Sequence, residues 1–135
     1  AVYEKEIRVG PEMLAAEIDF GAGRPLDAGR PRQSGMRAWY EGPVRDAAVV
    51  YVNGKRAGAV FAPPYRLDLK GFLKQGQNRL RIEAGNTSLN GLAGRGEPDY
   101  RDVAAKYGER FQMQDMKNMK PEPSGLLGHV RLVAR

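Results

Sequence analysis

Trp39 stands in a group of residues whose chemistry suits a sugar. It shares a predicted strand face with Arg37 and Glu41, and the apolar residues between them take the other face. An indole ring can stack on the C–H face of a pyranose, and the two charged side chains can hydrogen-bond its hydroxyls. Trp39 and Arg37 are therefore candidate sugar-binding residues. The alternative is that Trp39 packs under a long surface loop as a core residue.

Four further residues are candidates for ligand binding. Tyr65 follows two prolines at the mouth of a predicted strand, where its ring could line a binding edge. It also has the parity of the leucines in that strand, which predicts a core position instead. Asn86, Asn90 and Arg95 begin a long excursion, and loops at the end of a β-sandwich often carry ligands. Turns also favour asparagine, which leaves a purely structural role open for both asparagines.

Acidic residues in the same excursion could bind a hard cation. Asp99 and Asp115, with Glu97 and Asp102 nearby, could supply oxygen ligands to Ca²⁺. Their spacing differs from that of an EF-hand loop, and the helix dipole favours carboxylates in a first turn in any case. Asp99 and Asp115 are thus the candidate ligands of a structural calcium ion, and we expect no other cofactor.

Residues for catalysis are sparse. The chain has no cysteine, which excludes a thiol nucleophile, a cysteine-bound metal and disulfides. Its one histidine, His129, and Ser124 belong to no nucleophile elbow. Glycoside hydrolysis needs two carboxylates held across a cleft, and the sequence singles out no such pair. We therefore predict that this chain is not an enzyme by itself.

The elements that must position these residues are mostly strands. Period-two alternation or a short apolar run predicts eight of them, at residues 3–9, 16–20, 36–41, 47–52, 57–61, 65–70, 80–84 and 129–134. Asn53 and Gly54 form a strong hairpin signal. The length of 135 residues suits one domain. We predict an all-β fold, a β-sandwich that forms a single domain over residues 1–135.

One long segment, at about residues 86–124, lacks the strand pattern. Apolar residues at i, i+3, i+4 and i+7 over residues 100–107 predict one short helix, which Gly108 would end. Residues 110–120 mix methionine, aromatic and amide side chains, a composition too apolar for a disordered tail. We expect an ordered excursion that lies over one end of the sandwich or against a neighbouring domain.

Charge and hydropathy exclude two classes of partner. The chain carries 22 basic and 16 acidic residues, a formal net charge of +6, but acidic residues interrupt the basic ones and no basic run occurs. This distribution predicts a solvated surface and no nucleic-acid partner. The longest apolar run, residues 47–52, is far too short to cross a membrane. Because the chain starts at Ala1, we expect a processed or excised piece of a longer protein.

An ordered series of motifs resembles a known family. Residues 51–55 (YVNGK), 62–68 (APPYRLD) and 77–82 (QNRLRI) are similar to the galactose-binding-like, sugar-binding domain of large glycoside hydrolases of the β-galactosidase type. Residues 90–94 (NGLAG), 107–112 (YGERFQ) and 123–128 (PSGLLG) look like the C-terminal end of bacterial multidomain α-L-rhamnosidases. The chain departs from that pattern at Ser88 and His129, where the family often has an aromatic residue and a proline.

The resemblance implies a jelly-roll accessory domain of about eight antiparallel strands with one short helix in a long loop. Its partners would be the catalytic domain of a parent hydrolase, which is absent from this chain, and an oligo- or polysaccharide. The parent would be a bacterial enzyme that is secreted or periplasmic. The alternative is a purely structural or protein–protein interaction module without sugar affinity, which docks through the long excursion.

Overall fold

The computed structural model describes residues 1–25, 40–95, 99–108 and 120–135. Clustering of contacts within the chain separates two compact units. Unit 1 consists of Ala1–Asn86 together with Ser124–Arg135, and unit 2 is Thr87–Pro123. The strands lie in unit 1, and the two α-helices of the described residues lie in unit 2. We describe each unit by itself.

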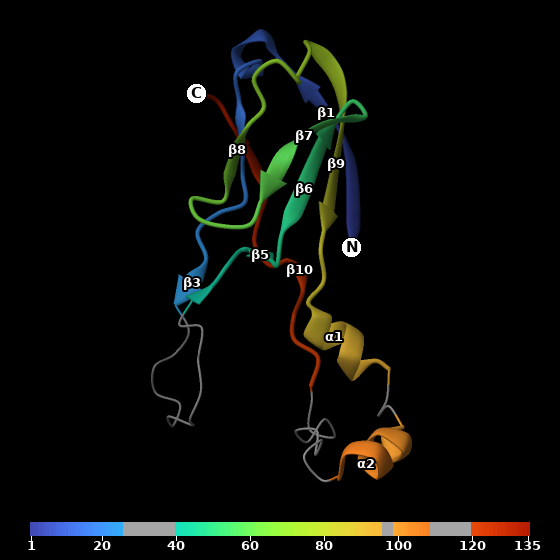
Figure 1. Ribbon diagram of the computed structural model, residues 1–135. Helices are drawn as coiled ribbons and strands as arrows, with labels where there is room; N and C mark the ends of the chain where they lie inside the picture. The colour runs from blue at the N-terminus through green and yellow to red at the C-terminus, as the bar shows by residue number, and fades with distance from the viewer. Residues whose placement is uncertain (26–39, 96–98, 109–119) are drawn as a thin grey trace. The chain divides into compact units, whose positions relative to one another are not determined.

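Unit 1 contains two principal antiparallel sheets (Figure 1). The larger sheet has four strands in the order β1 (Val2–Val9), β9 (Gly76–Ala84), β6 (Ala48–Val52) and β7 (Lys55–Val60). The smaller has three, in the order β11 (Arg131–Val133), β2 (Glu17–Asp19) and β8 (Arg66–Asp68). Two short ladders join β10 (Gly125–Leu126) to β5 (Val44–Arg45), and β3 (Arg24–Pro25) to β4 (Tyr40–Glu41).

The core lies between the two principal sheets. Alternate residues of the large sheet point inward, including Val50, Val52 and Ile82, and they pack in one cluster with Ile18 and Leu69 from the other layer. Each of these five side chains is at least nine-tenths buried. The outward positions of the same strands are mostly polar, as expected for sheets with one buried face. The predicted all-β sandwich is confirmed.

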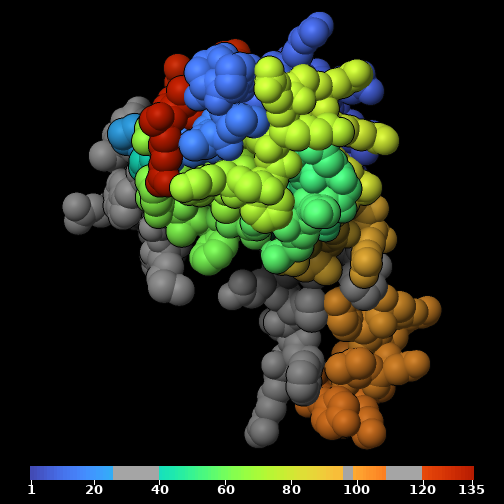
Figure 2. Space-filling model, turned by 90° about the horizontal axis from the view of Figure 1, so that it is seen from above, coloured from blue at the N-terminus to red at the C-terminus, as the bar shows by residue number. Residues whose placement is uncertain are grey.

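One end of the sandwich is closed by short irregular segments. The 3-10 turn η1 (Pro11–Met13) is followed by Leu14, and the loop between β8 and β9 contributes Phe72 and Leu73 to the core cluster. Leu69 N donates a hydrogen bond to Ala16 O at 3.0 Å, which ties that loop to the segment after η1. Figure 2 shows these segments side by side, in blue and yellow-green.

Strands occur in all eight predicted segments. Of the predicted strand at residues 36–41, only Tyr40 and Glu41 fall within the described residues. The predicted strand at 65–70 is shortened to β8, because Tyr65 has a left-handed backbone (φ 55°) that closes a turn with Ala62. The two-residue strands β3, β5 and β10 carry too little pattern to be predicted from sequence.

The hairpin signal at Asn53 and Gly54 is also confirmed. Both residues have positive φ angles, 53° and 81°, and the turn joins β6 directly to β7. Asn53 does more than turn the chain, since its main-chain N–H donates to Arg79 O and its Oδ1 accepts from Arg79 N. The hairpin is therefore tied to the middle strand β9.

Asn78 is the buried polar group that organises this region. It is 1% exposed. Its Oδ1 accepts from Lys74 N at 3.0 Å and from Asn53 Nδ2 at 2.9 Å, and its Nδ2 donates to Lys74 O and Gly76 O. Buried polar side chains are stable only when they are hydrogen-bonded in this way. Asn78 thus joins the start of β9 to the hairpin of β6 and β7.

Unit 2 contains α1 (Ser88–Ala93) and α2 (Arg101–Tyr107). The predicted short helix at residues 100–107 corresponds to α2, and Gly108 follows it with a φ of 70°. Helix α1 was not predicted, although Thr87 caps it by accepting a hydrogen bond from Asn90 N. A threonine cap before a stretch that contains Gly91 is too weak a signal to identify a six-residue helix from sequence.

We predict that Asn78→Ala destabilises the protein by about 2–4 kcal/mol, because main-chain groups of the β9 loop would remain buried without partners. The neighbouring variant Gln77→Ala, at an exposed position, should cost less than about 0.5 kcal/mol. Urea unfolding followed by circular dichroism measures both values. Equal losses in the two variants would contradict the role given to Asn78.

Candidate functional site

The predicted sugar-binding group around Trp39 is only partly within the described residues. Trp39 and Arg37 lie outside them. Glu41 is described, and its carboxylate is held by two guanidinium groups, that of Arg24 and that of Arg45 at 3.4 Å. The carboxylate is therefore already engaged within the protein, and a sugar hydroxyl would have to compete with both arginines for it.

Tyr65 lies in the core of unit 1. It is 8% exposed and belongs to the apolar cluster, as the second interpretation of this residue expects. Its carbonyl accepts a hydrogen bond from Phe20 N at 3.0 Å, which connects the start of β8 to the end of β2. A Cβ atom at Gly42 would lie 2.7 Å from the Tyr65 hydroxyl, so the ring fills the space that this glycine leaves.

The asparagines and Arg95 do not form one described cluster. Asn86 is the last residue of the first segment of unit 1, whereas Asn90 and Arg95 belong to unit 2. The Asn90 amide makes two hydrogen bonds with the main chain of Glu122, to its carbonyl at 2.8 Å and from its N–H at 2.7 Å. Asn90 thus fastens α1 to the returning chain. Arg95 is exposed just after α1.

The predicted calcium ligands are not brought together in the described residues. Asp115 lies outside them. The Asp99 carboxylate accepts from Nε and Nη2 of Arg101, and this hydrogen-bonded guanidinium holds the pKa of Asp99 below its usual value. A search of the described residues finds no group of three or more His, Cys, Asp or Glu side chains that could hold a metal. The calcium site stays a prediction.

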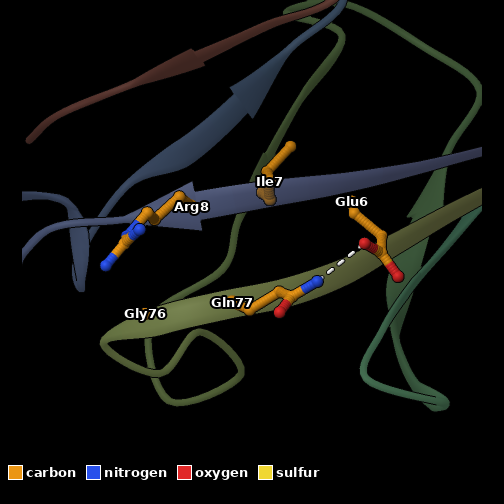
Figure 3. A pocket seen from close by; sticks show the side chains of 5 residues that line it. All are labelled: Glu6, Ile7, Arg8, Gly76 and Gln77. Carbon is orange, nitrogen blue, oxygen red and sulfur yellow. Dashed lines mark hydrogen bonds between the residues drawn. The ribbon is translucent and has the colours of Figure 1, made fainter.

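A polar hollow of about 550 Å³ lies where β1 and β9 meet at their ends (Figure 3). Glu6, Arg8 and Gln77 line it from the outer side of the sheet, and Gly76 leaves its floor without a side chain. Gln77 Nε2 donates to Glu6 Oε2 at 2.7 Å. Carboxylate, guanidinium and amide groups are planar donors and acceptors of the kind that bind hydroxyls. Among the described residues that line it, none has an aromatic ring.

The outer face of the large sheet continues from this hollow as a ladder of ion pairs. The register of β1 and β9 places Glu4 opposite Arg81 and Glu6 opposite Arg79, and these side chains share one face of the sheet. Arg79 donates to Glu4 at 2.7 Å, and Arg81 binds Glu83 at 2.6 Å. The Arg81 guanidinium also lies 5.9 Å from the centre of the Tyr51 ring. The hydrogen bond from Arg79 lowers the pKa of Glu4.

The opposite face of β1 borders an apolar cleft of about 410 Å³. Its lining is mostly apolar and comes from both layers of the sandwich: Tyr3, Glu4, Lys5 and Ile7 of β1, Leu80 and Ile82 of β9, Ile18 of β2, and Leu126, Val130, Arg131 and Leu132 near the C-terminus. Figure 3 shows Ile7 on the other side of β1 from Glu6. Alternation along β1 thus places Glu6 and Arg8 on the outer face and Tyr3, Lys5 and Ile7 beside the cleft, and Ile7 borders the hollow as well.

Other candidates for chemistry are dispersed. His129 and Ser124 are both exposed and lie on the segments around β10.

None of the helices in the described part of the chain has the length and apolar character needed to cross a membrane.

Comparison with known proteins relates the chain to glycoside hydrolases. A rhamnosidase from Novosphingobium sp. PP1Y matches 97% of this chain at 26% sequence identity and a TM-score of 0.60. The match occupies 10% of the rhamnosidase chain, so this chain has about a tenth of that protein's length. No protein-family model matches the chain, and no curated protein does.

Two further structures are more distant. A β-D-mannosidase from Dictyoglomus thermophilum matches 73% of this chain and 10% of its own, at 17% identity and a TM-score of 0.39. A β-glucuronidase from Bifidobacterium dentium, complexed with coumarin-3-O-glucuronide, matches 97% of this chain and 20% of its own, at 20% identity and a TM-score of 0.49.

We predict that Glu4→Gln lowers the melting temperature slightly at neutral pH and has no effect in acid. The folded-state pKa of Glu4 is lowered below 4.5, so its pairing stabilises the protein above that pH and is lost as the pH falls through the folded value. Arg79→Gln should give a loss in the same direction, although Arg81 still lies 3.7 Å from Glu4, and the loss in the double variant should be smaller than the sum of the two single losses. Thermal unfolding at pH 7 and pH 3 tests this, and additive losses would contradict it.

Proposed function

We propose that this chain is a non-catalytic accessory domain of a rhamnosidase-like glycoside hydrolase, packed on a catalytic domain that lies outside the chain. The observation that carries this proposal is the match with the rhamnosidase, which takes in almost the whole of this chain but a tenth of that protein. A segment of that size can form one accessory module beside a much larger catalytic region.

The state of the acidic side chains supports a non-catalytic role. Six carboxylates of unit 1 are each held by an arginine: Glu4, Glu17, Asp19, Glu41, Asp68 and Glu83. A glycosidase needs one carboxyl group that keeps its proton and a second that stays ionised across the substrate. Carboxylates held in arginine ion pairs on the outside of a sheet are typical of structural surface pairs, and within the described residues none of these six faces a second carboxylate across a cleft lined by both.

We also propose that the domain binds a sugar of the polysaccharide on which the parent enzyme acts, which would place the enzyme outside the cytoplasm, secreted or periplasmic. Support comes from the polar hollow at Glu6, Arg8 and Gln77, whose 550 Å³ would accommodate a monosaccharide, and from the predicted stacking residue Trp39. Asn86 and Arg95 remain candidates for additional hydrogen bonds.

The second candidate function is a structural module without sugar affinity. Its support is that many polar groups on the surface of unit 1 already pair within the protein, among them Glu6 with Gln77 and Glu41 with Arg24 and Arg45. In that case the domain would serve the parent enzyme through its packing alone.

We predict that isothermal titration with rhamnose, galactose and a panel of oligosaccharides gives millimolar or tighter binding, and that Trp39→Ala and Gln77→Ala each weaken it. Lys55→Ala, on the opposite edge of the sheet, is the matched control. If no sugar of the panel binds, the result supports the structural module without sugar affinity. Turnover of an aryl rhamnoside by the purified chain would contradict the non-catalytic role.

A further inference from the structure

The apolar cleft lies at an open side of the sandwich. Its floor consists of Ile18, Leu80 and Ile82, residues that belong to the buried core. The Tyr3 hydroxyl accepts a hydrogen bond from Leu126 N at 3.4 Å and so connects β1 to β10 at one point of the lining. The three side chains of the floor are already buried, and the apolar surface that a partner could cover comes from the partly exposed lining residues Tyr3, Ile7, Leu126, Val130 and Leu132.

The strands beside the cleft have free edges. Within the described residues, β1 pairs only with β9, and β11 pairs only with β2. All eight residues of β1 are in register with β9, so its other edge offers a long row of main-chain donors and acceptors. Val2 and Tyr3 on this strand are 58% and 39% exposed. A long edge strand next to an apolar cleft is the arrangement that accepts an added strand.

Lys5 determines which strand this edge can accept. It lies opposite Leu80 in the register, on the inward side of β1, and lines the cleft. Arg131 is a second basic residue of the lining, and the acidic one, Glu4, is paired with Arg79 and Arg81. An inward lysine on an edge strand discourages indiscriminate pairing, and two copies paired antiparallel about Lys5 would bring two ammonium groups together. A strand that carries a carboxylate at that position would be favoured instead.

We propose that β1 and the cleft dock an extended strand of the parent hydrolase in which apolar residues alternate with acidic ones. This inference rests on the proposed accessory function, because the region outside this chain supplies the occupant. In the similar rhamnosidase, nine-tenths of the chain lies outside the matched part. The added strand extends the large sheet beside β1, places its apolar side chains over Leu126, Val130 and Leu132, and pairs a carboxylate with Lys5.

The test uses the full chain and two capped eight-residue peptides, one alternating valine with glutamate and the other valine with lysine. We expect the glutamate peptide to shift the amide NMR signals of Val2–Val9 and to slow their hydrogen exchange. Lys5→Glu should weaken that binding about tenfold and give measurable binding of the lysine peptide. Lys55→Glu, which makes the same change in net charge at the hairpin, should alter it less than about twofold.

Several results would overturn the proposal: no binding of the glutamate peptide, shifts away from β1, equal losses in the two lysine variants, or sedimentation of the chain as a dimer joined through β1. The accessory function fails by a different route, if the natural polypeptide that contains this chain has no hydrolase activity. If the glutamate peptide binds β1 but the natural polypeptide has no hydrolase activity, then β1 is still a docking edge, and the strand that binds it does not come from a hydrolase.

Discussion

The two principal sheets bury one layer of apolar side chains between them, and the rest of the structure depends on how completely that layer is covered. On the side of β7 and β8 it is closely packed, since a Cβ atom at Gly58 would lie 2.7 Å from the Leu67 side chain. On the side of β1 and β11 the same layer borders a cleft of 410 Å³. This asymmetry is what a domain needs if one side of its core is completed by another part of a larger protein.

Polar side chains connect the strands around this apolar layer, through hydrogen bonds at Asn78 and through ion pairs on the outer faces of the sheets. Asn78 satisfies its buried amide with main-chain groups of its own loop and with Asn53, which aligns β9 with the neighbouring hairpin. On the outer faces of both sheets, arginines pair with carboxylates across strands, as Arg66 does with Glu17 and Asp19. Several arginines of unit 1 are therefore paired with carboxylates, in keeping with the dispersed charge pattern of the sequence.

Local sequence patterns predict local structure in this chain. The period-two strands, the Asn53–Gly54 turn and helix α2 all arise from residues close in sequence, and the structure contains each of them. Features made by distant residues could not be predicted in the same way. The Asn90 amide binds the main chain of Glu122, 32 residues away, and no local signal identifies that partner. The order of the strands and the cleft beside β1 depend on such long-range pairing.

In the candidate site too, features made by residues close in sequence could be predicted, and features made by distant residues could not. The buried position of Tyr65 could be anticipated because it alternates with Leu67 and Leu69 in the sequence. The polar hollow joins Glu6 and Gln77, which are 71 residues apart, and no local pattern predicts that contact. The pairing of Asp99 with Arg101 is local and could have been considered from the sequence, because the two residues are separated by one position. That ion pair occupies a carboxylate which the sequence alone assigns to a metal.

Immunoprecipitation from the cells that produce the protein, with antibodies raised against this 135-residue chain, tests the central claim most directly. The accessory-domain account predicts a polypeptide several times the length of the chain, and an immunoprecipitate that hydrolyses an aryl rhamnoside although the isolated chain does not. A precipitated polypeptide of the length of this chain, without any hydrolase activity, would contradict it.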